Sequence, residues 1–193
     1  MVDFEELRLA EVVQRVASLE PTPGAGPSLA WTCGLAAALV EMVSAVTLRQ
    51  QPPDPSAIEQ RRDRATAVRH QALSLADTDA AAYREVLAVK RRRQDPGHAA
   101  RLREALHAAA DPLVAIVEAG GDVTRLAADA RAQVRGGARG EAMTAAVLGD
   151  AVVQAGASLV ELNLAGSRDD PRLARVRHVA QAAADDRDRA LGG

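Results

Sequence analysis

The sequence predicts an all-α protein, an antiparallel bundle of about six to seven helices with an alanine-rich core. Hydrophobic residues make up 48% of the 193 residues but aromatic residues only 2%, so the apolar mass is alanine, leucine and valine. Alanine and leucine are among the strongest helix formers. No run of alternating hydrophobic residues indicates a strand. Segments rich in proline and glycine divide the chain into stretches of helical length. The length fits a single domain over residues 1–193.

The first three helices are expected over residues 3–19, 27–49 and 56–92. The first is amphipathic, and Pro21 follows its end. The second begins at Pro27 or Ser28, since proline suits the first helical position. It is apolar nearly all round, which places it at the centre of the fold. The third helix takes Ser56 as its cap, and Asp77-Thr-Asp79 is a candidate kink or division within it.

The later helices are expected over residues 98–118, 122–134, 141–165 and 170–191. Pro112 is expected to kink the first of these, because an internal proline clashes with the preceding turn. Gly120-Gly121 is expected to end it, and Asp122 to cap the next. A glycine-rich loop then precedes a long apolar helix, and Asp169 or Asp170 caps the last, charge-rich one.

Composition and spacing exclude several classes of function. A net charge of −2 gives no global field for nucleic acid, and the aromatics needed for base stacking are nearly absent. The single cysteine, Cys33, excludes a disulfide framework and is expected to be a small buried residue. The histidines show no metal-ligand spacing, so no metal site is predicted. Glu41 interrupts the best membrane candidate, and no signal peptide is evident, so we expect a cytoplasmic protein that does not enter the membrane.

Four segments resemble, in the same order, the motifs of a known family. They are Pro21-Thr-Pro-Gly-Ala-Gly-Pro-Ser28, Asp77-Thr-Asp-Ala-Ala-Ala-Tyr83, Ala109-Ala-Asp-Pro-Leu113 and Leu159-Val-Glu-Leu-Asn163. They are similar to the P-x-P-G-G-G-S, D-x-D-A-x-A-F, A-x-x-P-L and N-V-x-x-N motifs of the formiminotetrahydrofolate cyclodeaminases and methenyltetrahydrofolate cyclohydrolases. The resemblance implies an all-helical homodimer that binds folate in a cleft between helices.

The function implied by this resemblance is tetrahydrofolate one-carbon metabolism. The cyclodeaminase reaction closes 5-formiminotetrahydrofolate to 5,10-methenyltetrahydrofolate with release of ammonia. The cyclohydrolase reaction opens the methenyl compound with water to 10-formyltetrahydrofolate. The tetrahydrofolate derivative is then the substrate, and no separate cofactor is expected. The expected partners are this folate-type small molecule and a second copy of the chain.

The sequence also departs from the family pattern at several motif positions. Ala25 replaces the second glycine of the first motif, and Leu159 replaces the first asparagine of the last. Gly140 and Glu141 stand where the family carries a serine–aspartate pair, so one carboxylate is retained. These departures support a second hypothesis, a site-eroded member that binds a ligand or acts as an accessory subunit. A third hypothesis is a helical interaction module without a small-molecule site.

Glu141 and Asp79 are the candidate catalytic residues. Both reactions move a proton and pass through a charged one-carbon group, and a carboxylate of suitable pKa serves both needs. Glu141 takes the place of the family's aspartate, and Asp79 takes the place of the second acid in its motif. The structural alternatives are that Glu141 only favours the helix dipole and that Asp79 is solvated.

The candidate substrate-binding residues are of two kinds. Glycines near a helix start let a ligand approach the backbone, and a neighbouring hydroxyl can add a contact. Arginines bind the carboxylates of a folate tail. The candidates are Gly24, Gly26, Ser28, Arg91, Arg135 and Arg139. Their structural alternatives are a tight turn, an N-cap and solvated helix ends.

Overall fold

The structure is a computed structural model that describes residues 8–192 of the chain. Within this range it contains six α-helices, one short 3-10 helix and no strand, so the all-α prediction is confirmed. The α-helices are α1 (Leu9–Val16), α2 (Ala25–Arg49), α3 (Pro55–Arg91), α4 (His98–Gln133), α5 (Arg139–Asn163) and α6 (Pro171–Leu191). The 3-10 helix η2 covers Gly136–Ala138 in the predicted glycine-rich loop.

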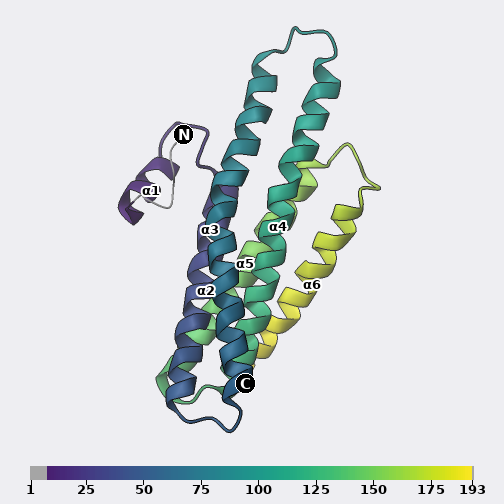
Figure 1. Ribbon diagram of the computed structural model, residues 1–193. Coiled ribbons are helices and arrows are strands. Elements are labelled where there is room, and N and C mark those ends of the chain that lie inside the picture. Colours follow the sequence, from purple (N-terminus) through teal and green to yellow (C-terminus); the bar gives the residue numbers. More distant parts are fainter. Residues whose placement is uncertain (1–7, 193) are drawn as a thin grey trace.

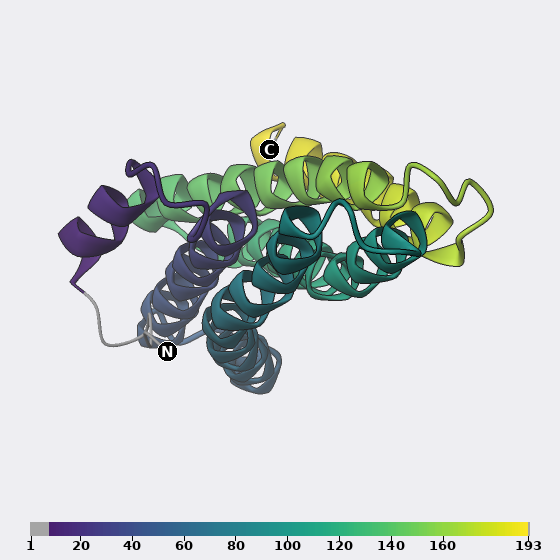
Figure 2. The same ribbon diagram turned by 90° about the horizontal axis from the view of Figure 1, so that it is seen from above.

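Helices α2 to α5 form a ring of four antiparallel helices. Each packs against the next, and α5 returns to pack against α2. Helix α6 lies along α4 and α5 on the outside of this ring (Figure 1). Helix α1 stands beside the upper part of α2, apart from the bundle, which Figure 2 shows from above. The upper end of the molecule, as drawn in Figure 1, therefore holds the α3–α4 turn, the start of α2 and the end of α5.

The core consists mainly of alanine and valine, as the composition predicts. Its largest fully buried side chains are Ile116, Leu164 and ten valines. Cys33 is fully buried within it, as predicted, and burial raises the pKa of its thiol to about 12. By length and composition alone, α2 and the segment Gly136–Asn163 would each suffice to cross a bilayer, and 44% of each window is buried in the bundle. Central helices of an alanine-rich bundle have this same profile.

Two helices begin at an Asp-Pro pair. The Oδ1 atoms of Asp54 and Asp170 accept hydrogen bonds from backbone N–H groups in the first turns of α3 and α6, and the following proline occupies the first helical position in each. The carboxylate satisfies an N–H that the helix leaves free, and proline has no N–H to satisfy. The cap prediction was therefore right at Asp170 and wrong at Ser56, which lies inside α3.

Helix α4 contradicts the predicted break. It continues through Pro112, Gly120-Gly121 and Asp122 without ending. The glycines serve packing between helices: a Cβ on Gly120 would lie 3.0 Å from methyl groups of Val152 and Val153 and 3.2 Å from the Gly149 carbonyl oxygen. A glycine inside a helix costs about 1 kcal/mol relative to alanine, and here it permits a close crossing of α4 and α5.

The remaining helix boundaries differ only at their ends. Helix α1 covers the centre of the predicted 3–19 helix, and residues 3–7 of that prediction lie outside the described range. Helix α2 begins two residues earlier than predicted, at Ala25, with Gly24 as its N-cap. Helix α3 runs through Asp77-Thr-Asp79 without a division. Helices α3 and α4 are thus more continuous than local breaker residues suggested, because tertiary contacts stabilise them along their length.

The crossing of α4 and α5 predicts the effect of one methyl group. In Gly149→Ala the added Cβ would lie 3.1 Å from the Gly120 carbonyl oxygen and 3.1 Å from the Thr124 amide nitrogen. Backbone atoms cannot move aside as a flexible side chain can, so we expect a loss of about 1–3 kcal/mol in the free energy of unfolding. Urea denaturation measures it. Gly140→Ala in the same helix meets nothing within 4 Å and should be neutral or stabilising; equal effects of the two changes would contradict the packing argument.

Candidate functional site

A cleft of about 470 Å³ opens at the upper end of the bundle, and we call it the upper cleft. The start of α2, the upper part of α3 and α4 and the end of α5 form it. Its polar or backbone-exposing members are Thr22, Gly24, Gly26, Asp79, Tyr83, Lys90 and Asn163, and leucines at 106, 113, 159 and 162 supply apolar walls. An apolar cleft with a few convergent polar groups is the usual form of a small-molecule site.

Asp79 is the one acidic residue that lines the upper cleft. It lies in α3 and is only 7% exposed. Among the described residues, no cation or hydrogen-bond donor lies within bonding distance of its carboxylate. Burial raises the pKa of Asp79 to about 6, because the charged form loses solvation that nothing replaces. A carboxyl with a pKa near neutrality can both accept and donate a proton at physiological pH.

Gly26 fixes where this carboxylate lies. A Cβ at Gly26 would overlap with the carboxylate of Asp79, so the two helices meet here only because residue 26 has no side chain. The first N–H groups of an α-helix have no intrahelical partner, and Gly24, the N-cap of α2, has no side chain to cap them. The structure thus brings Gly24, Gly26 and Asp79 together, three residues that the sequence selected separately.

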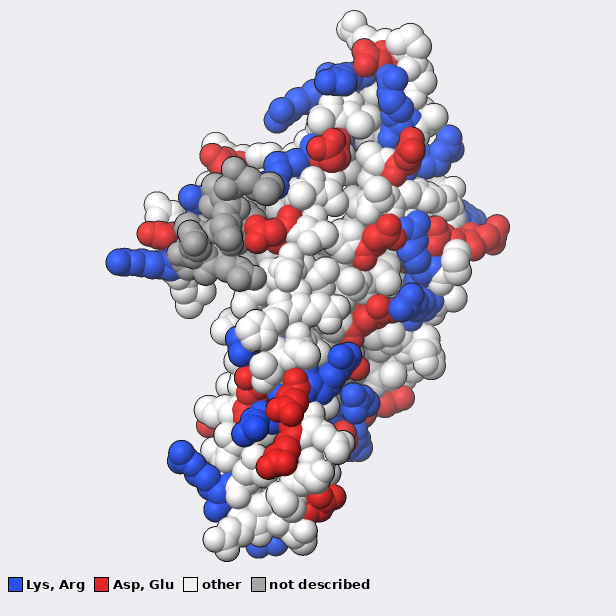
Figure 3. Space-filling view, in the orientation of Figure 1, with Lys and Arg blue, Asp and Glu red and all other residues white. Residues whose placement is uncertain are grey.

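Two other residues of α3, C-terminal to Asp79, lie on the same face of the helix. Tyr83 lies one turn beyond it and Lys90 three turns beyond, and both line the cleft. Arg91, the predicted binding residue of this basic run, is exposed and outside the cleft lining. The helical period from Asp79 indicates residue 90 rather than 91, and it was the signal that could have identified Lys90. Lysine and arginine side chains gather over the α3–α4 turn above the cleft (Figure 3).

Asn163 lines the cleft although it was not a predicted binding residue, whereas Ser28 was predicted and lies outside it. Asn163 closes α5 and lines the cleft, although only its membership of the last motif pointed to it. Leu159, one turn earlier, also lines the cleft and presents an apolar side chain where the family motif has asparagine. Ser28 lies outside the cleft lining, and its hydroxyl donates to the Gly24 carbonyl oxygen at 2.8 Å. It is a residue of the first turns of α2 and not the N-cap.

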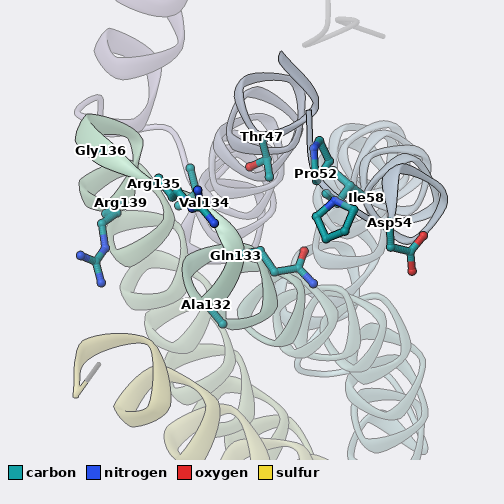
Figure 4. Close-up of a pocket in the computed structure, with 11 residues that line it drawn as sticks. Thr47, Pro52, Asp54, Ile58, Ala132, Gln133, Val134, Arg135, Gly136 and Arg139 are labelled. Carbon is teal, nitrogen blue, oxygen red and sulfur yellow. The ribbon is translucent and has the colours of Figure 1, made fainter. Parts of the chain in front are cut away.

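Three predicted residues lie at the opposite end of the bundle. Arg135 and Arg139 line a lower pocket of about 520 Å³ with Thr47, Pro52 and Gln133, and Figure 4 shows Arg139 directed away from Thr47 and Pro52. Gln50 holds this loop through hydrogen bonds of 3.0 and 3.2 Å to the backbone of Arg135.

Glu141 lies beside this lower loop, in the first turn of α5. Its Oε2 is buried, and no described residue hydrogen-bonds to it. From Glu141 to Asn163 the helix rises by about 33 Å, at roughly 1.5 Å per residue. One chain therefore does not bring Glu141, Arg135 or Arg139 together with Asp79. No group of three or more His, Cys, Asp or Glu side chains among the described residues has the arrangement of a metal site.

Comparisons with known proteins point to one family. The family model described as formiminotransferase-cyclodeaminase matches residues 8–182. The crystal structure of formiminotetrahydrofolate cyclodeaminase from Thermotoga maritima superposes with a TM-score of 0.85 at 22% sequence identity, covering 97% of this chain and 96% of that one. No curated protein gives a significant match.

The raised pKa of Asp79 predicts a pH-dependent cost in stability. The folded state holds the proton up to about pH 6, whereas the unfolded chain releases it near 3.8. Stability should therefore fall as pH rises from about 4 to 6, by roughly 2–3 kcal/mol in total. Asp79→Asn removes the ionisation, so at pH 7 this variant should be more stable than the wild type by up to that amount.

Urea denaturation of both chains at pH 4, 5, 6 and 7 measures this difference. Subtracting the two curves cancels the titration of all other groups. A difference that stays constant across this range would mean that Asp79 ionises in the folded chain as it does in water.

Proposed function

The chain belongs to the formiminotransferase-cyclodeaminase family, and from this premise we propose that its upper cleft binds a one-carbon derivative of tetrahydrofolate and carries out the cyclodeaminase reaction. The observation that carries the proposal is Asp79, a buried carboxyl of raised pKa at the base of a cleft between helices. It lies where the family motif has its second acid, against the glycine turn that opens α2.

Asp79 would act as the proton shuttle of the cyclisation. In 5-formiminotetrahydrofolate with its formimino nitrogen protonated, N10 attacks the formiminium carbon and forms a tetrahedral centre that carries a neutral amino group and a positively charged N10–H. Asp79 accepts the proton from N10 and donates it to this amino group, which leaves as ammonia. The product is the 5,10-methenyl cation, and its positive charge lies close to the regenerated carboxylate. A pKa near 6 suits both transfers at neutral pH.

The rest of the cleft suits the remaining parts of the substrate. Leucine side chains offer apolar walls to the ring system, and Tyr83 and Asn163 offer hydrogen bonds. Lys90 lies at the end of α3 nearest the basic run, where cations can bind the carboxylates of the glutamyl tail. We assign Arg91 a supporting part there, in the solvent-exposed run that follows Lys90.

A second candidate function follows from Leu159. An apolar side chain in the cleft wall replaces an amide expected to hold the pterin or its one-carbon group. Tetrahydrofolate binding without turnover would then describe an eroded site.

The cyclohydrolase reaction uses the same cleft, with water attacking the methenyl carbon and Asp79 accepting the proton. The lower end of the bundle holds three further candidates, Glu141, Arg135 and Arg139. They take part in the chemistry only if the site lies at the lower end of this chain or of a second copy.

We also propose that the chain is a homodimer. Two large apolar side chains on one face of α2, Leu35 and Met42, are 57% and 43% exposed. An apolar groove of about 640 Å³ lies beside them, between α1 and the bundle, and Trp31 and Val13 line it. An exposed apolar surface of this kind is typical of an interface between subunits.

Turnover assays of carboxyl variants test the assignment of the site. With 5-formiminotetrahydrofolate, formation of the methenyl compound is followed by its absorbance. We expect Asp79→Asn to lower kcat at least about 100-fold, since the proton shuttle is lost while the side chain keeps its shape. Substrate binding, measured by calorimetry, should change far less.

Glu141→Gln is the matched control, because it also removes one carboxylate and lies at the other end of the bundle. It should keep near wild-type turnover. Loss of activity in Glu141→Gln with retention in Asp79→Asn would move the catalytic site to the lower end. Binding by the wild type without any turnover would favour the eroded-site function.

Light scattering coupled to gel filtration tests the dimer. We expect twice the mass of one chain for the wild type and the mass of one chain for Leu35→Asp, because a charge buried in an interface without a partner disrupts it. Val147→Asp places the same charge on a similarly exposed valine of α5 and should remain dimeric. A wild type that elutes as a single chain at every concentration would contradict the proposal.

A further inference from the structure

Arg61 is a buried cation near the lower end of α3. The residue is 6% exposed, and its side chain reaches from α3 to hydrogen-bond partners on α2 and α4. Its Nε donates to the Ser44 hydroxyl at 3.1 Å, and its Nη1 donates to the Gln133 side-chain oxygen at 2.6 Å. Both acceptors are neutral. The third nitrogen, Nη2, is buried and has no hydrogen-bond acceptor among the described residues.

No carboxylate among the described residues forms an ion pair with Arg61. Burial lowers the pKa of its guanidinium, and the charge of Asp129 offsets only part of this effect. A pocket of about 470 Å³ opens over Arg61 between α3 and α4, and Arg64, Arg125 and Asp129 also line it. Asp129, the only acid in this lining, is itself paired with Arg189 at 2.9 Å and lies 3.7 Å from Arg125. Arg64 and Arg125 both form ion pairs with Asp122, which lies outside the lining, so Arg61 is the one cation of this lining without an ion-paired carboxylate among the described residues.

We propose that this pocket is a binding site for a small oxyanion, a phosphate or carboxylate group, with Arg61 as its central ligand and Arg64 and Arg125 at its mouth. A buried guanidinium is held most favourably by a charged acceptor, and its planar fork matches the paired oxygens of such a group. The neutral acceptors Ser44 and Gln133 orient the fork without neutralising it. An oxyanion would supply the acceptor that Nη2 lacks.

This site is separate from the upper cleft. Arg61 and Asp79 are eighteen residues apart on α3, which corresponds to about 27 Å along the helix. The two sites therefore do not share a ligand contact, and oxyanion binding here does not depend on the proposed reaction. The pocket lies next to the lower pocket, with which it shares Gln133.

Thermal unfolding of the full chain in inorganic phosphate tests the site, with sodium chloride added to keep ionic strength constant. A ligand that binds only the folded state raises the midpoint, by about 3–6 °C at ten times its Kd for a domain of this size. The rise should saturate, and calorimetry should give one phosphate per chain. Acetate serves as the carboxylate probe: a response to both anions, or to phosphate alone, supports the site and defines which oxyanion it takes.

The decisive variant is Arg61→Met, which keeps an unbranched side chain, shorter than that of arginine, and removes the guanidinium and its charge. Replacing an unbalanced buried charge by an apolar group is often neutral or stabilising, so we expect cooperative unfolding without any phosphate response. Arg84→Met, on an exposed position of the same helix, should respond as the wild type does. If Arg61→Met does not fold, Arg125→Gln should weaken phosphate binding several-fold while leaving the buried fork intact.

Equal shifts in phosphate and in chloride would overturn the proposal, because the effect would then be general screening and not binding at Arg61. Retention of the phosphate response in Arg61→Met would overturn it as well. Loss of folate turnover without loss of the phosphate response concerns the upper cleft alone, so the two proposals fail independently.

Discussion

The close approach of helix backbones is the constraint on which this structure depends. Residues without a side chain, or with a single methyl group, occupy the contacts between helices: Gly120 faces α5, Gly149 faces α4 and Gly26 faces Asp79 of α3. A core of alanine and valine offers less apolar area per residue than one of leucine and phenylalanine. Density of packing must compensate, because dispersion contacts fall off steeply with small gaps. Helices α3 and α4, thirty-seven and thirty-six residues long, pack against each other in this bundle.

The same constraint creates the upper cleft. Gly26 lets the start of α2 lie against Asp79, and this contact removes water from the carboxylate without supplying a cation in exchange. The desolvation that raises the pKa of Asp79 also makes its ionised form destabilising. The same burial thus suits Asp79 to proton transfer and lowers the stability of the folded chain. Such a trade-off is common at functional sites. Arg61 at the other end of α3 shows the complementary case, a buried cation whose neighbours hydrogen-bond to it without balancing its charge.

The sequence was informative where signals are local and misleading where they depend on partners. Asp169 or Asp170 was predicted to cap the last helix, and Asp170 does so. Ser56 was chosen as the cap of α3 over Asp54, although Asp54-Pro55 is the same kind of pair as Asp170-Pro171. Gly120-Gly121 suggested a break, because nothing in the local pattern reveals that α5 packs against it. In the upper cleft, the structure brings together Gly24, Gly26 and Asp79, which the sequence selected separately from two motifs. The sequence placed Glu141, Arg135 and Arg139 in the same candidate site as these residues. Sequence motifs do not show at which end of a bundle each helix end lies.

Cys33 gives the molecule a built-in reporter. It is the only cysteine of the chain, it is fully buried in the central helix α2, and its thiol has a pKa of about 12. The thiolate is the reactive form, so the folded chain should be nearly inert to thiol reagents. Any modification must then pass through an opening of the core around α2. The rate of labelling at Cys33 therefore measures how often the bundle opens, without an engineered probe or a change to either proposed site.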